Sequence, residues 1–346
     1  MQTTSRLPIS EHCEQPHHVT SNNRSLFRLP IFSWVFGLIA FASGFQASGD
    51  NPYPVVAVEM SVQQVSEHVY YVQGASRVAA ANYGLVSNAA FVVTDEGVVV
   101  FDTLGTPSLG AMFKSRIQDI TDKPIVRVYN SHYHADHFYG NEAFEGPDTE
   151  FIAPRGAERY LTGETASQRL EERKQSLHPW VNDSTRLIYP DRYLVSEGRF
   201  SLGGVSLRAV NLGSAHSEGD LILYVESDDV LLSGDIIFDN RIPFIGSTNT
   251  RGWLEILAQL NKKALKAVIP GHGSVSDNPQ KIVRLTYSYL AFLRQIMGQA
   301  IEQWIPFDEA YESADWSAYM EYPAFIEANR QNAYGVYLSM EEESLE

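Results

Sequence analysis

The chain has 346 residues, of which 44% are hydrophobic and 20% charged, and this ordinary globular composition excludes wholesale disorder. Its formal net charge of −16 argues against nucleic acid as a partner, because phosphate binding requires clustered Lys and Arg. The length allows one large domain or two small ones.

The first fifty residues are predicted to be a targeting segment rather than part of the fold. Arg24 and Arg28 precede an apolar run over residues 29–45, and small residues follow it. This order is typical of a secretory signal peptide, so we expect residues 1–50 to be a signal peptide with a polar leader, and the protein to be periplasmic. The alternative is a membrane anchor through residues 29–45, with the rest of the chain facing the periplasm. Because the single cysteine, Cys13, precedes this run, the mature chain is predicted to lack disulfides and thiolate metal ligands.

From residue 65 onward, the pattern alternates between strands and amphipathic helices. Strands are expected at 69–72, 89–94 and 98–101, and a turn at Asp95-Glu96-Gly97 joins the last two in a hairpin. Apolar residues at three- and four-residue steps over 106–120 indicate a helix that packs on a sheet. Further strands are expected at 126–129, 151–153, 200–202, 205–210, 221–225, 230–232 and 267–269, and helices at 155–177 and 253–265. This alternation predicts an α/β fold.

A loop rich in metal-binding side chains follows the strand at 126–129. It reads Asn130-Ser131-His132-Tyr133-His134-Ala135-Asp136-His137. Residues two apart in an extended segment point to the same side, so His132 and His134 can grip one ion, while Asp136 and His137 can turn toward a second. Carboxylate and imidazole ligands suit zinc, and also iron or manganese. A surface loop that is rich in histidine by chance is the alternative.

Three more candidate ligands lie in turns beside predicted strands. His216 precedes the strand at 221–225, Asp235 follows the strand at 230–232, and His272 follows the strand at 267–269. Turns at strand ends are where functional side chains gather at the rim of a sheet.

Two aromatic segments are candidates for the wall of a substrate pocket. Residues 178–198 form a polar insert that contains Trp180, and the alternative is a surface loop with its own small aromatic cluster. Residues 238–244 contain Phe238 and Ile242 and are expected to form an apolar lip, with ordinary loop packing as the alternative.

With their flanking residues, the candidate ligands resemble the metallo-β-lactamase superfamily over roughly residues 65–275. The resemblance implies a four-layer αβ/βα sandwich with a metal site at one edge, between two sheets. It also implies two zinc ions, one held by His132, His134 and His216, the other by Asp136, His137 and His272, with Asp235 as the bridge. Asp102 lies close to where the superfamily has an acid that orients a metal ligand, and its alternative is a simple turn or helix cap.

The resemblance assigns residues 51–275 to a catalytic domain and residues 276–346 to a helical extension that packs on it or on a second copy of the chain. The expected activity is that of a binuclear zinc-dependent hydrolase. A metal-bridging hydroxide, oriented by Asp136, would attack a carbonyl ester, thioester or lactone of a small-molecule substrate.

Two alternative functions stay open. One is β-lactamase activity of the class B type, which is disfavoured because zinc β-lactamases with a cysteine at the position of Asp235 carry a drug-binding Lys three residues on, where this chain has Phe238. The other is a metal-binding accessory protein of a periplasmic oxidation system. A weaker resemblance, carried by the targeting segment, the Asp ligand and Asn332-Ala333-Tyr334 before a Glu-rich end, connects the chain to exported hydrolases that accompany quinoprotein alcohol dehydrogenases and sulfur-oxidation gene clusters.

Overall fold

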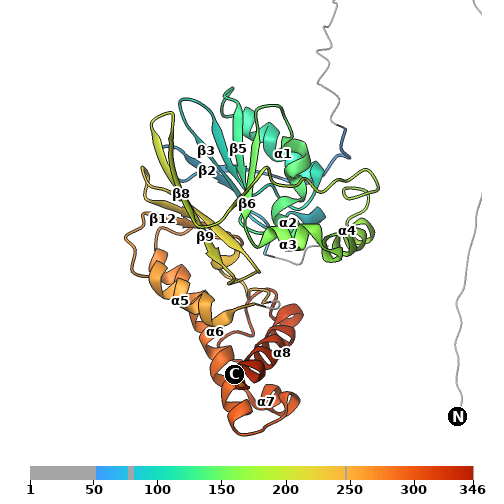
Figure 1. The fold of residues 1–346 in the computed structure, drawn as a ribbon, viewed down its shortest axis with the longest axis vertical. Helices are drawn as coiled ribbons and strands as arrows, with labels where there is room; N and C mark the ends of the chain where they lie inside the picture. The colour runs from blue at the N-terminus through green and yellow to red at the C-terminus, as the bar shows by residue number, and fades with distance from the viewer. Residues whose placement is uncertain (1–51, 77–81, 246–247, 346) are drawn as a thin grey trace, which may run out of the picture. The chain divides into compact units, whose positions relative to one another are not determined.

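Two β-sheets pack against each other in the part of the chain that the structure describes. The computed structural model describes residues 52–76, 82–245 and 248–345, so the targeting segment predicted at 1–50 lies outside the described residues. Within this part, one sheet has the strand order β1-β2-β3-β4-β5-β6-β7 and the other has the order β12-β11-β10-β9-β8. Figure 1 shows strands of both sheets beside one another, with α1 next to the larger sheet and α5 next to the smaller.

The larger sheet changes from antiparallel to parallel pairing at β4. Its strands are β1 (Val62–Gln64), β2 (Val69–Val72), β3 (Ala89–Val93), β4 (Val98–Phe101), β5 (Ile125–Tyr129), β6 (Glu150–Pro154) and β7 (Arg192–Leu194). β1 to β4 pair antiparallel and β4 to β7 pair parallel. All four residues of β4 are buried, as expected for a strand covered on both faces.

The smaller sheet carries the second half of the candidate ligands. Its strands are β8 (Glu197–Leu202), β9 (Val205–Gly213), β10 (Asp220–Val225), β11 (Val230–Leu232) and β12 (Ala267–Ile269). β8 alternates exposed and partly buried residues because it is an edge strand with one covered face. The pair β11–β12 is parallel, so Asp235 and His272 follow strands that end at the same edge.

The packing confirms the predicted four-layer αβ/βα sandwich. One core cluster joins the facing sides of the two sheets, including Val92 and Phe101 from one and Leu207 and Leu223 from the other. A second cluster packs α1 (Pro107–Gln118) on the outer face of the larger sheet. A third packs α5 (Thr250–Leu260), α6 (Pro279–Glu302) and α8 (Phe325–Glu343) on the outer face of the smaller sheet and on one another.

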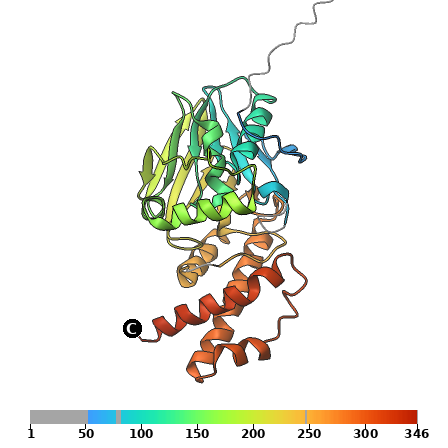
Figure 2. The same cartoon turned by 90° about the vertical axis from the view of Figure 1, so that its right-hand side faces the viewer.

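The segment 155–198 differs from its sequence prediction. One long helix is predicted over 155–177, but the structure has α3 (Ala157–Thr162) and α4 (Glu164–Ser176), separated by Gly163 in an extended conformation. Glycine has a low helix propensity, so a break is favourable there. The insert at 178–198 also supplies β7, which extends the larger sheet. Figure 2 shows α4 crossing the ends of the sheets on the side of the C-terminal helices.

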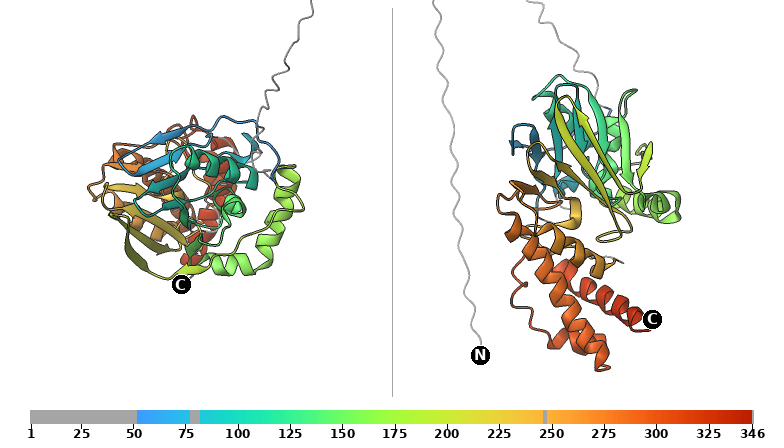
Figure 3. Two further views of the ribbon diagram at one scale, coloured as in Figure 1. Left: turned by 90° about the horizontal axis from the view of Figure 1, so that it is seen from above. Right: turned by 60° about the vertical axis from the view of Figure 1, so that its left-hand side comes forward.

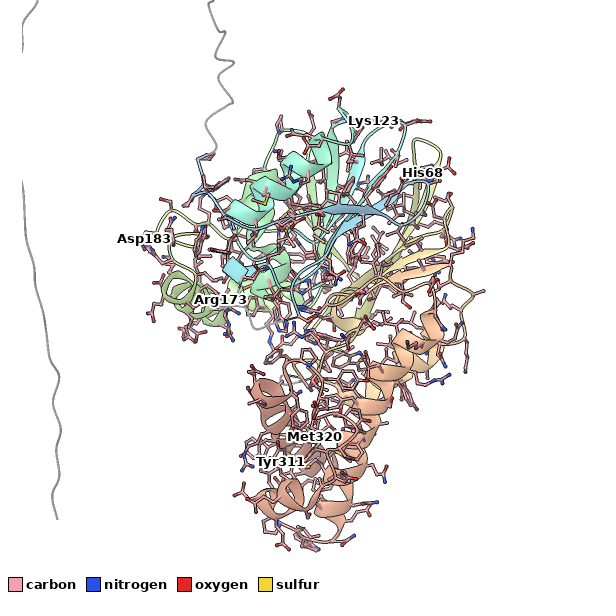
Figure 4. All side chains as sticks on the ribbon, turned by 180° about the vertical axis from the view of Figure 1, so that it is seen from behind. His68, Lys123, Arg173, Asp183, Tyr311 and Met320 are labelled. Carbon is pink, nitrogen blue, oxygen red and sulfur yellow. The ribbon has the colours of Figure 1, made fainter. Side chains whose placement is uncertain are left out.

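The chain ends in helices, as predicted. α6 contacts α8, and the shorter α7 (Phe307–Ser313) lies between them in sequence and contacts both. The right-hand view of Figure 3 shows α6 and α8 side by side, and Figure 4 labels Tyr311 and Met320 in this helical region. None of the described helices has the length and apolarity needed to cross a membrane. The division between a catalytic domain and an extension at residue 275 stays a prediction.

Candidate metal centre

The histidine-rich loop is held in place by a buried amide network. After β5, residues 131–133 form a bend and His134 is extended, and α2 (Ala135–Phe138) then carries Asp136 and His137. The side chain of Asn130 donates to the His137 carbonyl oxygen at 3.2 Å and exchanges hydrogen bonds with the side chain of Asn141. These groups are buried and paired, so the network holds the loop in the observed conformation.

The remaining candidate ligands reach the same edge from three turns. His216 lies between β9 and β10, Asp235 lies in a short 3₁₀ helix after β11 (Gly234–Ile236), and His272 follows β12. The His216 turn is fixed by the buried carboxylate of Asp220, which accepts hydrogen bonds from the Ala215 and Ser217 backbone amides. Burial raises the pKa of Asp220 to about 7, while the hydrogen bonds from the turn lower it.

The structure brings all seven predicted ligands together in two clusters. One contains His132, His134, His216 and Asp235, and the other contains Asp136, His137 and His272. In each cluster the ligand atoms lie within 4.8 Å of one another, which is the spacing that one shared ion requires. This division matches the one that the superfamily resemblance implies.

Asp235 lies between the two clusters. Its Oδ2 atom is 3.3 Å from His216 Nε2 in its own cluster and 3.4 Å from His272 Nε2 in the other. Its Oδ1 atom is 3.2 Å from His137 Nε2. One carboxylate therefore faces ligands of both clusters, which is the geometry of a bridge.

Unpaired buried atoms show that the residues fit metal ions. Within the described part of the chain, His132 Nε2 is buried without a hydrogen-bond partner, and His137 Nε2 and Asp235 Oδ1, although 3.2 Å apart, form no aligned hydrogen bond. Buried polar atoms in native proteins are normally paired, so three unpaired ligand atoms that converge on one region indicate a missing partner. Divalent ions bound by nitrogen and carboxylate oxygen would supply it.

Asp102 orients a ligand from each cluster. Its Oδ2 atom is 2.8 Å from His137 Nδ1 and also accepts a hydrogen bond from Ser131 Oγ at 2.8 Å. Ser131 Oγ is in turn 2.9 Å from His132 Nδ1. When both Nδ1 atoms donate, the Nε2 atoms of His132 and His137 are left free to bind metal. Ser131 was not singled out from sequence, although its place directly before His132 makes such a contact available.

The protonation states of the histidines differ within the site. Burial lowers the pKa values of His132 and His134, and it lowers that of His216 to about 3, so all three are neutral and ready to bind a cation. Burial also acts to lower the pKa of His137, but the carboxylates of Asp235, Asp102 and Asp136 outweigh it, so this pKa lies well above its ordinary value. Without metal, His137 holds a proton that it must lose when it binds an ion.

We therefore expect zinc binding to release at least one proton at pH 7, because a ligating histidine must be neutral. Because the pKa of His137 is raised in the metal-free protein, zinc affinity should rise with pH until that pKa is passed. Calorimetric titration of the metal-free protein with zinc, in buffers of different ionisation enthalpy, measures the number of protons released. A binding enthalpy that does not depend on the buffer would contradict this assignment of His137.

A cavity of about 830 Å³ opens over the two clusters. Its lining includes Asp136, His216, Asp235 and His272 from the clusters. Phe238 lines it as predicted and stacks on His272 with ring centroids 5.3 Å apart, which shields that ligand from water. Other lining residues come from α3 and α4, from Arg241, Phe244, Ile245 and Thr248, and from α8. Figure 4 labels one of them, Arg173 on α4.

Two residues proposed for the pocket wall lie elsewhere. The indole nitrogen of Trp180 donates to the Val55 carbonyl oxygen at 3.0 Å, and its ring packs edge-on against Tyr83, so Trp180 covers the larger sheet instead of the cavity. Ile242 is buried in the core cluster beside the smaller sheet. The wall that sequence reasoning assigned to 178–198 is supplied by α3, α4 and α8.

A sandwich of two sheets with histidine and aspartate clusters at one edge defines a class of metal-dependent hydrolases. The family model described as "Metallo-beta-lactamase superfamily" matches residues 82–272, which is more than half of the chain. The chain belongs to the metallo-beta-lactamase superfamily and is a metal-dependent hydrolase.

Relatives and solved structures agree with this membership. The "Metallo-beta-lactamase type 2" of Bacteroides fragilis is 20% identical over 253 residues, which cover 71% of this chain and 89% of that protein. "Metallo-beta-lactamase IND-1" of Chryseobacterium indologenes is 24% identical over 54% of this chain and 71% of its own. A stereoselective inverting sec-alkylsulfatase from Pseudomonas sp. has a TM-score of 0.63 at 17% identity, covering 81% of this chain and 50% of that chain. At this identity the likeness concerns the fold, and the chain spans half of the length of the sulfatase.

Proposed function

We propose that the protein is a binuclear zinc-dependent hydrolase of a small-molecule carbonyl ester, thioester or lactone. The observation that carries this proposal is the pair of ligand clusters that meet at Asp235 on the floor of an open cavity. A protein that only carries metal has no need for a cavity at the point where both clusters are accessible. A complete ligand set with a shared carboxylate therefore favours catalysis.

The residues of the chain have separate tasks in this reaction. Two bound zinc ions supply Lewis acidity, which lowers the pKa of water toward neutral and stabilises charge on a substrate oxygen. Asp136 faces the cavity with a side chain that is 18% exposed, so it can orient the attacking water. Burial acts to raise the pKa of Asp136, but the charges of His137 and His272 outweigh burial and lower it, so the carboxylate is ionised and can accept a hydrogen bond from the water.

A hydrolysis panel on zinc-loaded protein tests this proposal. It compares an aryl ester, a lactone, two thioesters, a β-lactam and a secondary alkyl sulfate, each with an EDTA-treated control. We expect EDTA-sensitive turnover that is fastest on an ester, thioester or lactone. Turnover of the β-lactam should be slower, because Phe238 stands where zinc β-lactamases with a cysteine ligand carry their drug-binding Lys. Turnover that EDTA does not affect would contradict the proposal.

Two outcomes of the same panel favour the alternatives. Fast hydrolysis of the β-lactam alone would favour β-lactamase activity, for which the relatives from Bacteroides fragilis and Chryseobacterium indologenes are named. No turnover of any compound, with metal still bound, would favour the accessory protein of a periplasmic oxidation system. Export to the periplasm remains part of the proposal, and it rests on the apolar run at 29–45.

A further inference from the structure

Arg241 is a buried cation beside the metal centre. Its residue is 3% exposed, yet it lines the cavity. No carboxylate among the described residues lies within ion-pair distance of it, and its Nε atom has no hydrogen-bond partner there. Burial lowers the pKa of Arg241, and the more distant charges of Asp235, Asp136 and Glu327 offset this only in part. A buried charge without a partner is strongly unfavourable, so such a group in a cavity wall indicates a ligand of opposite charge.

The guanidinium lies over the Phe244 ring, 5.4 Å from its centroid, and metal binding removes the hydrogen bond that it makes. Arg241 Nη1 lies 2.9 Å from His272 Nδ1, and the same Nδ1 atom lies 2.6 Å from the Val86 carbonyl oxygen. Nδ1 cannot accept from Arg241 and donate to Val86 at the same time. When His272 binds metal through Nε2, its proton is on Nδ1 and the hydrogen bond to Val86 is the one that forms. Arg241 then has no acceptor.

The C-terminal helix α8 fixes the segment that follows Arg241. Asn332 is 1% exposed, and its side chain accepts from the Ile245 amide at 2.7 Å and donates to the Pro243 carbonyl oxygen at 2.7 Å. The Ile242 amide donates to the Pro323 carbonyl oxygen at 3.0 Å, just before α8. A buried amide with partners on both sides holds this segment rigidly. These contacts come from a region beyond the family match at 82–272.

The charge balance of the site favours an anion. The ligand set has carboxylates from Asp136 and Asp235, while its histidines are neutral when they bind metal. Two carboxylates neutralise only part of the charge of two divalent ions, and Arg241 adds to the excess. Among the acids of the cavity wall, Glu218 is paired with Arg159, and Glu327 makes no ion pair with Arg241.

We propose that Arg241 binds an oxyanion of the substrate, such as a carboxylate or a sulfate, and that Asn332 positions it from α8. This proposal rests on the proposed function, and it narrows the substrate to a molecule that carries an acid group near the bond that is cleaved. Guanidinium binds such groups through two parallel hydrogen bonds, which a point charge reproduces less well.

A matched pair of esters tests the role of Arg241. Mono-(4-nitrophenyl) adipate and the 4-nitrophenyl ester of adipamic acid share the same ester and chain. The first ends in a carboxylate and the second in an uncharged carboxamide. In zinc-loaded Arg241→Gln we expect kcat/KM for the acid to fall about tenfold or more, because the variant loses a charge-assisted hydrogen bond to the carboxylate. The kcat/KM for the amide should change little. Arg241→Lys should recover part of the loss. Asn332→Ala should raise KM for the acid more than it lowers kcat.

Arg330→Gln is the matched control, since Arg330 is an exposed arginine of α8 that pairs with Asp308. It should leave both esters unchanged. Metal content and thermal melting of each variant separate a loss of binding from a loss of the site. An equal fall on both esters in variants that retain their metal would overturn the proposal, because Arg241 would then act through His272.

Sulfate binding gives a second readout that does not depend on turnover. Titration of the zinc-loaded protein with sodium sulfate should show binding about tenfold weaker in Arg241→Gln than in the wild type. If neither ester is hydrolysed, the ester activity fails as a function while the sulfate titration still tests Arg241. Equal sulfate affinity in the two proteins would overturn the assignment of the anion site.

Discussion

Replacement of Asp136 by Ala is expected to abolish hydrolysis while the fold stays intact. Asp136 Oδ2 lies 3.7 Å from His137 Nε2 and 3.4 Å from His272 Nε2, so the substitution removes one of three ligands from the second cluster. Loss of a residue that only supports a ligand lowers metal affinity or activity by about 10- to 100-fold, so loss of the ligand itself should exceed about a hundredfold. Steady-state kinetics and elemental analysis measure the two effects.

The fold should tolerate this change. No hydrogen bond to the Asp136 carboxylate is present among the described residues, and the side chain is partly open to the cavity. The melting temperature of the metal-free protein is therefore expected to stay close to that of the wild type. Glu218→Ala is a suitable control, because Glu218 lines the same cavity but belongs to neither cluster. If Asp136→Ala retained wild-type hydrolysis, the proposed role of Asp136 would be wrong.

Replacement of Gly271 by Ala is expected to remove metal from both clusters. A Cβ atom at this position would overlap Asp235 Oδ1 and would lie 2.7 Å from the carbonyl carbon of Gly234. The backbone cannot easily move away, because the Gly271 amide donates to Gly234 at 2.8 Å and its carbonyl accepts from Asn88 at 2.7 Å. Asp235 must then rotate out of its position between the clusters.

The expected cost in stability is moderate, and the expected loss of activity is large. Added atoms in a packed site cost about 1–3 kcal/mol of unfolding free energy. Activity should fall by more than about a hundredfold because the shared ligand is displaced from both ions. Gly146→Ala is the control, since the nearest atom to its added Cβ would be 3.6 Å away. A Gly271→Ala protein that holds as much zinc as the wild type would show that Asp235 is not the bridge.

Most of the metal centre could be predicted because its ligands depend on local patterns. His132, His134, Asp136 and His137 lie within six residues of one another, so a local pattern of ligand residues was enough to identify them, although Asp136 and His137 lie on the short helix α2. His216, Asp235 and His272 follow the ends of predicted strands, and strands of one sheet bring such turns to a common edge. The alternation of strands and helices predicted an α/β fold, whereas the four layers were implied by the resemblance to the superfamily.

The cavity wall could not be predicted because it depends on packing between distant segments. Trp180 is aromatic and lies in an insert, but its indole finds a backbone acceptor at Val55 and stays on the larger sheet. The helix breaks at Gly163, and α4 then runs along the cavity. The single helix predicted over 155–177 gave no indication of this change in direction. The place of Asn332 in the wall follows from the contact of α8 with the segment 243–245, which no local pattern encodes.

The number of metal ions per chain tests the binuclear centre most directly. The wild-type protein would be loaded with zinc, dialysed, and measured by elemental analysis beside variants in each cluster, His216→Ala and His272→Ala. We expect about two zinc ions per wild-type chain. Either variant should hold fewer, because His216 is a ligand of one cluster and His272 is a ligand of the other. A wild-type protein that retains one ion or none, with an intact fold, would contradict the assignment of two clusters joined by Asp235.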